Sequence, residues 1–254
     1  MALAGFAGCA SGPRTPVTYA DQAEAAYADA LEDFFDDDCL IAEPAFEEVK
    51  RKYPYSRFAA LSELRAADCR YRQGKYAEAI QSYQQFIRYH PSHEEVPYAH
   101  FQVATGHFEQ TPSDWLLEPP AYERDQRFTR DALRLLRRFI LNYPEHPLVA
   151  RAQQLVTQSV ELLADHELYV ANFYLDRDAP EAAVGRLRTL LRSYSGASQA
   201  PDALLLLGRT YRTLERTSEA QTAYRELLTR FPKSAQAERA REQLADMGSP
   251  ASRT

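Results

Sequence analysis

Five segments of this sequence end alike, and their spacing limits what the chain can fold into. Each places an aromatic residue shortly before a helix-ending residue, in "EEVKRKYPYS", "QQFIRYHPSH", "RRFILNYPEH", "TLLRSYSGAS" and "ELLTRFPKSA". The intervals between the breaks are 37, 53, 51 and 37 residues. Such a recurrence is typical of helical repeats, in which each unit buries its apolar face against its neighbours. The breaks lie at Pro54, Pro91, Pro144, Ser195 and Pro232.

The last repeat shows the tetratricopeptide pattern most clearly, in "DALLLLGRTYRTLERTSEAQTAYRELLTRFP". Gly208 and Ala220 are small enough to let two helices approach closely, while larger side chains fill the space around them. An ordinary bundle of amphipathic helices is the alternative, and ordered spacing across five units favours the repeat. The consensus positions are Leu207, Gly208, Tyr211, Ala220, Tyr224 and Pro232.

Composition agrees with helix, because only nine of 254 residues are glycine and alanine, leucine, glutamate, glutamine and arginine fill long stretches. We therefore predict an all-α fold, a tetratricopeptide-repeat solenoid of about five helix pairs with a C-terminal capping helix. The predicted pairs are 18–35 with 39–53, 56–72 with 76–89, 94–109 with 126–142, 147–176 with 180–194, and 198–214 with 217–230, and the cap is 234–246.

The two long intervals have different causes. In the third unit, residues 111–125 include the pair Pro119–Pro120 and read as an insertion between the two helices. In the fourth unit, residues 147–178 contain no internal glycine or proline, which predicts one helix on the order of 45 Å long.

Two cysteines fall at matching heights on helices predicted to be antiparallel neighbours. Cys39 precedes the turn near Tyr55 by about as many residues as Cys69 follows it. In an oxidising compartment a disulfide between them is feasible if their faces agree. The alternative is two free cysteines that pack as small apolar side chains.

Motifs of catalysis and cofactor binding are missing from the sequence. It contains no HExxH, GxxxxGK[ST], GxGxxG or GxSxG. The run Asp36–Asp38 lacks the glycine and alternating ligands of a calcium loop, and His100 and His107 are too far apart for the helical zinc pair. We expect no enzyme, no cofactor and no metal, although an enzyme that uses the Trp115 loop as a lid is a rival reading. A net charge of -6 argues against nucleic acid as a partner.

Three segments outside the generic repeat resemble one family. They are "QFIRYHPSH" followed by "VPYAHFQVATGHF", then "ERDQRFTRDALRLLRRFILNYP", and "HELYVANFYLDRDAPEAAVGRLRTLLRSY". Together with the repeats, they make residues 20–245 similar to the BamD family, the outer-membrane lipoproteins of the bacterial β-barrel assembly machinery.

The resemblance implies a non-enzymatic scaffold with several partners. It would bind the POTRA domain of the barrel-forming subunit, receive unfolded outer-membrane proteins and contact other assembly lipoproteins. The family's basic docking residue corresponds to Arg192, with Arg186 and Arg188 as helpers. The family's N-terminal units receive a substrate's C-terminal segment, and Tyr55 and Phe58 are the aromatic residues that we expect to be exposed there.

The N-terminal stretch "LAGFAGCASG" fits the same family. Residues 6–9 resemble a lipobox, which makes Cys9 the expected lipidation site, residues 1–8 a truncated signal-peptide remnant and residues 9–17 a tether. Any contact with the outer membrane, on its periplasmic face, would come from this end, because no later run is long and apolar enough to span a bilayer.

The remaining predictions concern domains and a second function. We group the repeats into residues 18–142 and 143–247, followed by a disordered tail at 248–254. Another periplasmic tetratricopeptide lipoprotein, an adaptor in a cell-envelope or cell-division complex, is the alternative function. The 123–144 segment and the extended fourth unit speak against it.

Overall fold

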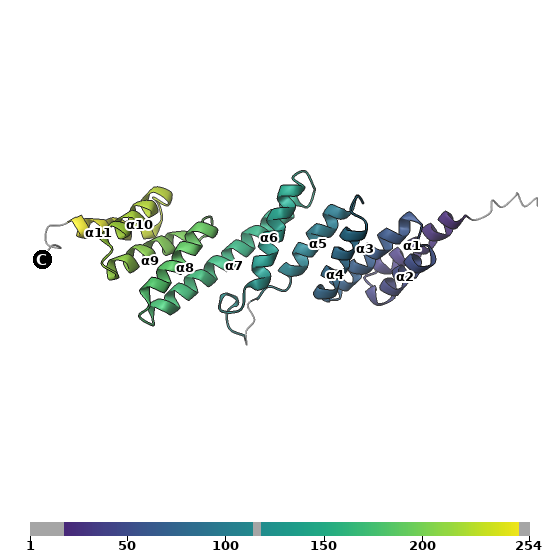
Figure 1. The fold of residues 1–254 in the computed structure, drawn as a ribbon, viewed down its shortest axis with the longest axis horizontal. Helices are drawn as coiled ribbons and strands as arrows, with labels where there is room; N and C mark the ends of the chain where they lie inside the picture. Colours follow the sequence, from purple (N-terminus) through teal and green to yellow (C-terminus); the bar gives the residue numbers. More distant parts are fainter. Residues whose placement is uncertain (1–17, 114–117, 249–254) are drawn as a thin grey trace, which may run out of the picture. The chain divides into compact units, whose positions relative to one another are not determined.

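The computed structural model describes residues 18–113 and 118–248, and within them it is helical throughout (Figure 1). Eleven α-helices and one short 3-10 helix form this part of the chain, with no strand. The chain divides into two compact units, Met1–Pro91 and Ser92–Thr254. The grouping of repeats at residue 142 stays a prediction, and the predicted signal remnant, tether and most of the tail lie outside the described residues.

Unit 1 contains the first two helix pairs. Helix α2 packs against α1 and α3, and α3 packs against α4. Aromatic side chains fill the centre of the first pair, where Phe46 contacts Tyr27 and Phe34. The bounds are α1 Tyr19–Phe35, α2 Cys39–Lys52, α3 Arg57–Arg72 and α4 Tyr76–Tyr89.

Unit 2 contains three further pairs and a final helix that packs on α9 and α10. The all-α fold of five tetratricopeptide pairs with a capping helix is thus confirmed, and each predicted helix agrees with the structure to within a few residues. The bounds are α5 Val96–Phe108, η1 Ala121–Glu123, α6 Arg127–Asn142, α7 Val149–Leu175, α8 Pro180–Ser193, α9 Ala200–Thr213, α10 Thr217–Arg230 and α11 Ala235–Gly248.

The second helix of every pair ends in one backbone conformation. The residue that follows the helix has φ between -124° and -133° and ψ between 37° and 57°. Four of the five break residues are prolines, and proline keeps the residue before it out of the helical region. The repeat seen in the sequence is therefore a repeated chain reversal, at Tyr53, His90, Tyr143, Tyr194 and Phe231.

The turn inside four of the pairs is also repeated. One residue in each has a positive φ, between 54° and 74°, and the amide that follows it bonds back to the carbonyl five residues earlier at 2.8 to 2.9 Å. This is the Schellman arrangement that ends a helix and turns the chain. The positions are Asp37, Gly74, Asp178 and Glu215.

In the third pair, the described residues between α5 and α6 show no such positive φ, and the insertion there contacts the long helix of the fourth pair. Helix α7 has 27 residues, which makes it about 40 Å long. A ring nitrogen of His166 lies 2.6 Å from the carbonyl oxygen of Tyr122, and the ring of Tyr169 lies 5.5 Å from the Tyr122 ring. The two long intervals in the sequence are therefore linked, because the extended α7 carries the side chains that hold the insertion.

Candidate partner-binding surfaces

A groove in unit 2 lies along helices α8, α9 and α10, and we call it the α8–α10 groove. Its volume is about 620 Å³. The lining residues of α8 lie three or four positions apart, as do those of α10, so each set shares one helix face and forms one wall of the groove. The floor is apolar and includes the buried side chains of Leu207, Tyr211 and Ala223. The remaining lining residues are Arg188, Leu191, Arg192, Arg216, Ser218, Glu219, Thr222 and Glu226.

The two walls of the groove carry opposite charges. On the α8 wall, Arg188 and Arg192 are exposed and form no ion pair within the described part of the chain. On the α10 wall, Glu226 pairs with Arg230 at 2.6 Å, and a hydrogen bond from Ser218 lowers the pKa of Glu219. The groove fits a partner that offers an apolar side chain with a carboxylate beside it.

The structure separates the three arginines predicted to bind a partner. Arg188 and Arg192 lie one turn apart on the groove wall. Arg186 points toward α7 instead, where its guanidinium lies 3.4 Å from the carboxylate of Glu167. Because Glu167 is buried, this ion pair has a structural task, the compensation of a buried charge.

Tyr55 and Phe58, expected to be exposed together, are not alike in the structure. Tyr55 is 95% exposed in the turn between α2 and α3. Phe58 is only 8% exposed, so the expectation of its exposure is wrong. It lies in the first turn of α3, where its ring packs 5.3 Å from that of Tyr27 in the core of unit 1. Helical register, which the sequence of a turn does not reveal, directs Phe58 inward.

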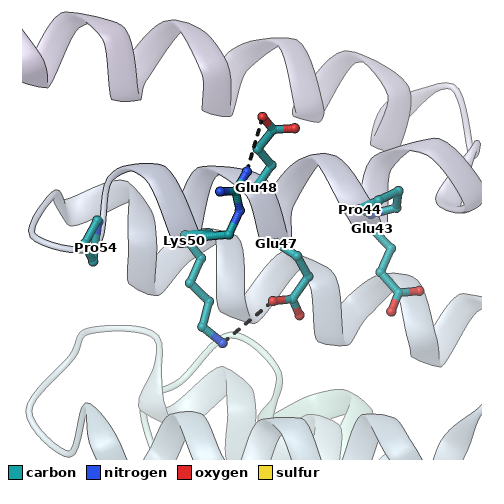
Figure 2. A pocket seen from close by; sticks show the side chains of 7 residues that line it. Glu43, Pro44, Glu47, Glu48, Lys50 and Pro54 are labelled. Atoms are coloured by element: carbon teal, nitrogen blue, oxygen red, sulfur yellow. Dashed lines mark ion pairs between the residues drawn. The ribbon is translucent and has the colours of Figure 1, made fainter.

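A second pocket lies along α2 and extends to Pro54 (Figure 2). Its volume is about 870 Å³, and its lining includes Pro54, the residue directly before Tyr55. Most of its charges are paired with each other, as Figure 2 shows for Lys50, which reaches the carboxylate of Glu47 at 3.8 Å. This pocket therefore offers little unpaired charge to a ligand, and Tyr55 is the exposed aromatic beside it. The other lining residues are Glu43, Pro44, Glu48 and Arg51.

The described residues form neither a metal site nor a membrane-spanning helix. No group of three or more His, Cys, Asp or Glu side chains there could hold a metal ion. None of the helices in the same residues combines the length and the apolar character needed to cross a membrane. Cys9 and Trp115 lie outside the described residues, so the predicted lipidation site and the proposed lid residue have no structural counterpart.

Sequence reasoning missed the acidic wall and the floor of the α8–α10 groove. Leu207 and Tyr211 were assigned to core packing, and they do pack there, but one side of each also lines the groove. A signal was present on α10, where Glu219, Thr222 and Glu226 follow one helical face. Only the position of α8 beside that face makes it part of a groove.

Comparison with known proteins gives one family. Residues 19–225 match the family model "YfiO: Outer membrane lipoprotein". The chain is 27% identical to the outer membrane protein assembly factor BamD of Neisseria gonorrhoeae over 213 residues, which cover 83% of this chain and 80% of the relative. It is 28% identical to the BamD of Caulobacter vibrioides over 223 residues, covering 87% and 70%. A thermophilic TPR protein from Thermus thermophilus superimposes with a TM-score of 0.37 and 14% identity, covering 89% of this chain and 98% of that one.

Proposed function

The chain belongs to the YfiO family of outer membrane lipoproteins, and on that premise we propose that it is a non-enzymatic scaffold of the β-barrel assembly machinery. The relatives that it matches over most of their length are named outer membrane protein assembly factor BamD. Its fold of helix pairs provides surfaces for protein partners. The absence of catalytic motifs from the sequence is in keeping with this role.

The α8–α10 groove is the proposed docking site for the POTRA domain of the barrel-forming subunit. The observation that carries this assignment is the pair Arg188 and Arg192, two exposed cations above an apolar floor that form no ion pair with any residue the structure describes. A carboxylate on the partner would lose little by binding there, because no internal ion pair has to break first. The floor residue Tyr211 supplies the kind of aromatic surface that contributes most to interfaces.

Charge reversal of the α8 wall tests this docking site. We expect Arg192→Glu to weaken binding of the purified POTRA domains about 10-fold, and the double variant with Arg188→Glu to weaken it further, because repulsion replaces attraction to the same carboxylate. Calorimetric titration would measure the dissociation constant, with circular dichroism confirming the fold. Arg151→Glu, at an exposed arginine of α7 outside the groove, is the matched control and should bind as wild type. Wild-type affinity in the double variant would exclude the groove as the docking site.

Tyr55 is the proposed contact for the C-terminal segment of unfolded outer-membrane proteins. Its side chain is almost fully exposed, and the preceding residue, Pro54, lines the α2 pocket. An exposed aromatic side chain can anchor an extended peptide with alternate apolar residues at low conformational cost. Phe58 has no part in this proposal, since its ring belongs to the core.

Removal of the Tyr55 ring tests the peptide contact. We expect Tyr55→Ala to reduce photo-crosslinking of a synthetic peptide with alternate apolar residues and a terminal phenylalanine about 5-fold, with no loss of stability. Phe35→Ala is the matched control, because Phe35 is also an exposed aromatic of unit 1 but is the last residue of α1, before α2 begins, whereas Tyr55 follows the end of α2. Equal crosslinking by the two variants would place the peptide elsewhere.

Lipidation of Cys9 completes the proposal. Acyl chains on Cys9 would hold the scaffold at the periplasmic face of the outer membrane, and more than one chain is needed for a stable anchor. The family's description as outer membrane lipoproteins supports this placement. Other assembly lipoproteins would join through surfaces that neither groove nor pocket occupies.

A further inference from the structure

Cys39 and Cys69 meet inside unit 1. Cys39 is the first residue of α2, and Cys69 lies in the last turn of α3, the helix that runs antiparallel beside it. Both side chains are buried, at 5% and 0% exposure, in the same apolar cluster. Both are free thiols in the structure.

Neighbouring groups hold the two cysteines in register. The backbone amide of Gln73 bonds to the carbonyl of Cys69 at 3.0 Å, and its side-chain nitrogen bonds to the carbonyl of Cys39 at 3.1 Å. Arg72 donates a hydrogen bond of 2.7 Å to the carbonyl of Phe34 and stacks over the Phe34 ring. The start of α2 and the end of α3 are thus connected without help from the sulfur atoms.

We propose that Cys39 and Cys69 form a disulfide bond that fastens the first helix pair to the second. The two thiols give up two protons and two electrons as the S–S bond forms. A disulfide of an oxidoreductase or of oxidised glutathione accepts them and leaves as two thiols, by way of a mixed disulfide. The supply of oxidant rests on the proposed periplasmic location, since that compartment sustains disulfides.

The position of the two cysteines determines what the bond would stabilise. Helices α2 and α3 pack against each other, and they belong to the first and the second helix pair. In a repeat array each unit contacts only its neighbours, so stability depends on such interfaces. A bond that closes a loop of about thirty residues limits the unfolded chain and so stabilises the interface between these two pairs.

Burial also sets when the bond can form. Burial, together with the neighbouring Cys39, raises the pKa of the Cys69 thiol, so little of the reactive thiolate exists in the folded state. Oxidation should therefore be fast while unit 1 folds and slow once it has folded. The same burial shields the finished bond from reductants.

Mass spectrometry of the purified chain tests the proposal. Cys9→Ser leaves Cys39 and Cys69 as the two cysteines of the chain. After refolding in a glutathione redox buffer, denaturation with N-ethylmaleimide should add no label, and the mass should be lower than that of the reduced protein by two hydrogen atoms. Prior reduction should allow two labels. Two labels without reduction, or glutathione attached to each thiol, would overturn the proposal.

Thermal unfolding provides a second readout. Reduction should lower the melting temperature of unit 1 by about 10 °C, because the loop-closing constraint is lost. The double variant Cys39→Ala with Cys69→Ala should melt at the same temperature with and without reductant. Equal melting temperatures of the oxidised and reduced parent protein would contradict a stabilising bond. Because both measurements use purified protein, their outcome is independent of POTRA binding, which tests the proposed function by itself.

Discussion

Replacement of Gly208 by alanine should destabilise unit 2 by about 2 kcal/mol, a large effect for a single methyl group. A Cβ atom at Gly208 would lie 2.7 Å from both Cδ1 and Cζ of Tyr224, and it would also touch Cε1. Tyr224 is fully buried, so its ring has no free space into which it could move. Alanine gains about 1 kcal/mol over glycine in helix propensity, and the overpacking exceeds that gain.

The same substitution at Gly185 is the control and should have the opposite sign. A Cβ atom at Gly185 meets nothing within 4 Å, and the residue is exposed in the middle of α8. Gly185→Ala should therefore stabilise unit 2 by up to about 1 kcal/mol through helix propensity alone. Urea unfolding followed by hydrogen exchange of peptides from α8–α10 would measure both changes in unit 2 itself. Equal shifts in the two variants would contradict the close contact between α9 and α10.

Loss of the Phe46 ring should destabilise unit 1 by about 4 kcal/mol. Phe46 is fully buried, and its ring lies 5.7 Å from that of Tyr27 and 6.0 Å from that of Phe34. Alanine there would leave a cavity between α1 and α2. No side chain of either helix can move in to fill the volume of the lost ring. Since a small domain is stable by only about 5 to 15 kcal/mol, the variant should lose a large share of its stability and unfold at a clearly lower temperature.

Phe35 provides a matched control within the same helix pair. Its ring is 74% exposed, so Phe35→Ala should change the free energy of unfolding by less than about 0.5 kcal/mol. Hydrogen exchange of peptides from α1 and α2 would compare the two variants at neutral pH. If Phe46→Ala and Phe35→Ala exchanged at the same rate, the packing of the first pair around Phe46 would be wrong.

Several features of the fold could be predicted because they depend on local chemistry. Proline at Pro54, Pro91, Pro144 and Pro232 restricts the preceding residue whatever the tertiary surroundings, so the helix ends were correct. Gly208 and Ala220 report a close helix approach in any repeat of this type, and the structure places the Tyr224 ring against Gly208. The prediction that Cys39 and Cys69 lie at the same level of two antiparallel helices rested on the number of residues between each cysteine and the turn, and the structure places them at the start of α2 and the end of α3.

Other features of the site depend on which helix face meets which neighbour. Tyr55 lies in the turn and Phe58 only three residues later, yet the side chain of Tyr55 is exposed and that of Phe58 is buried. Arg186, Arg188 and Arg192 share one helix, and rotation about its axis directs Arg186 to Glu167 and the other two to the groove. A change of one residue in a helix turns a side chain by about 100°, which propensity and spacing do not fix.

The sequence by itself determined the five helix pairs, their capping helix and the family, because repeated breaks and consensus spacing act through the chain's own local geometry. Only the tertiary structure decided that α8, α9 and α10 form a groove lined by Arg188 and Arg192, that α7 holds the insertion, and that Cys39 and Cys69 are buried in one cluster. These contacts join residues distant in sequence, and their existence depends on how whole helix faces pack.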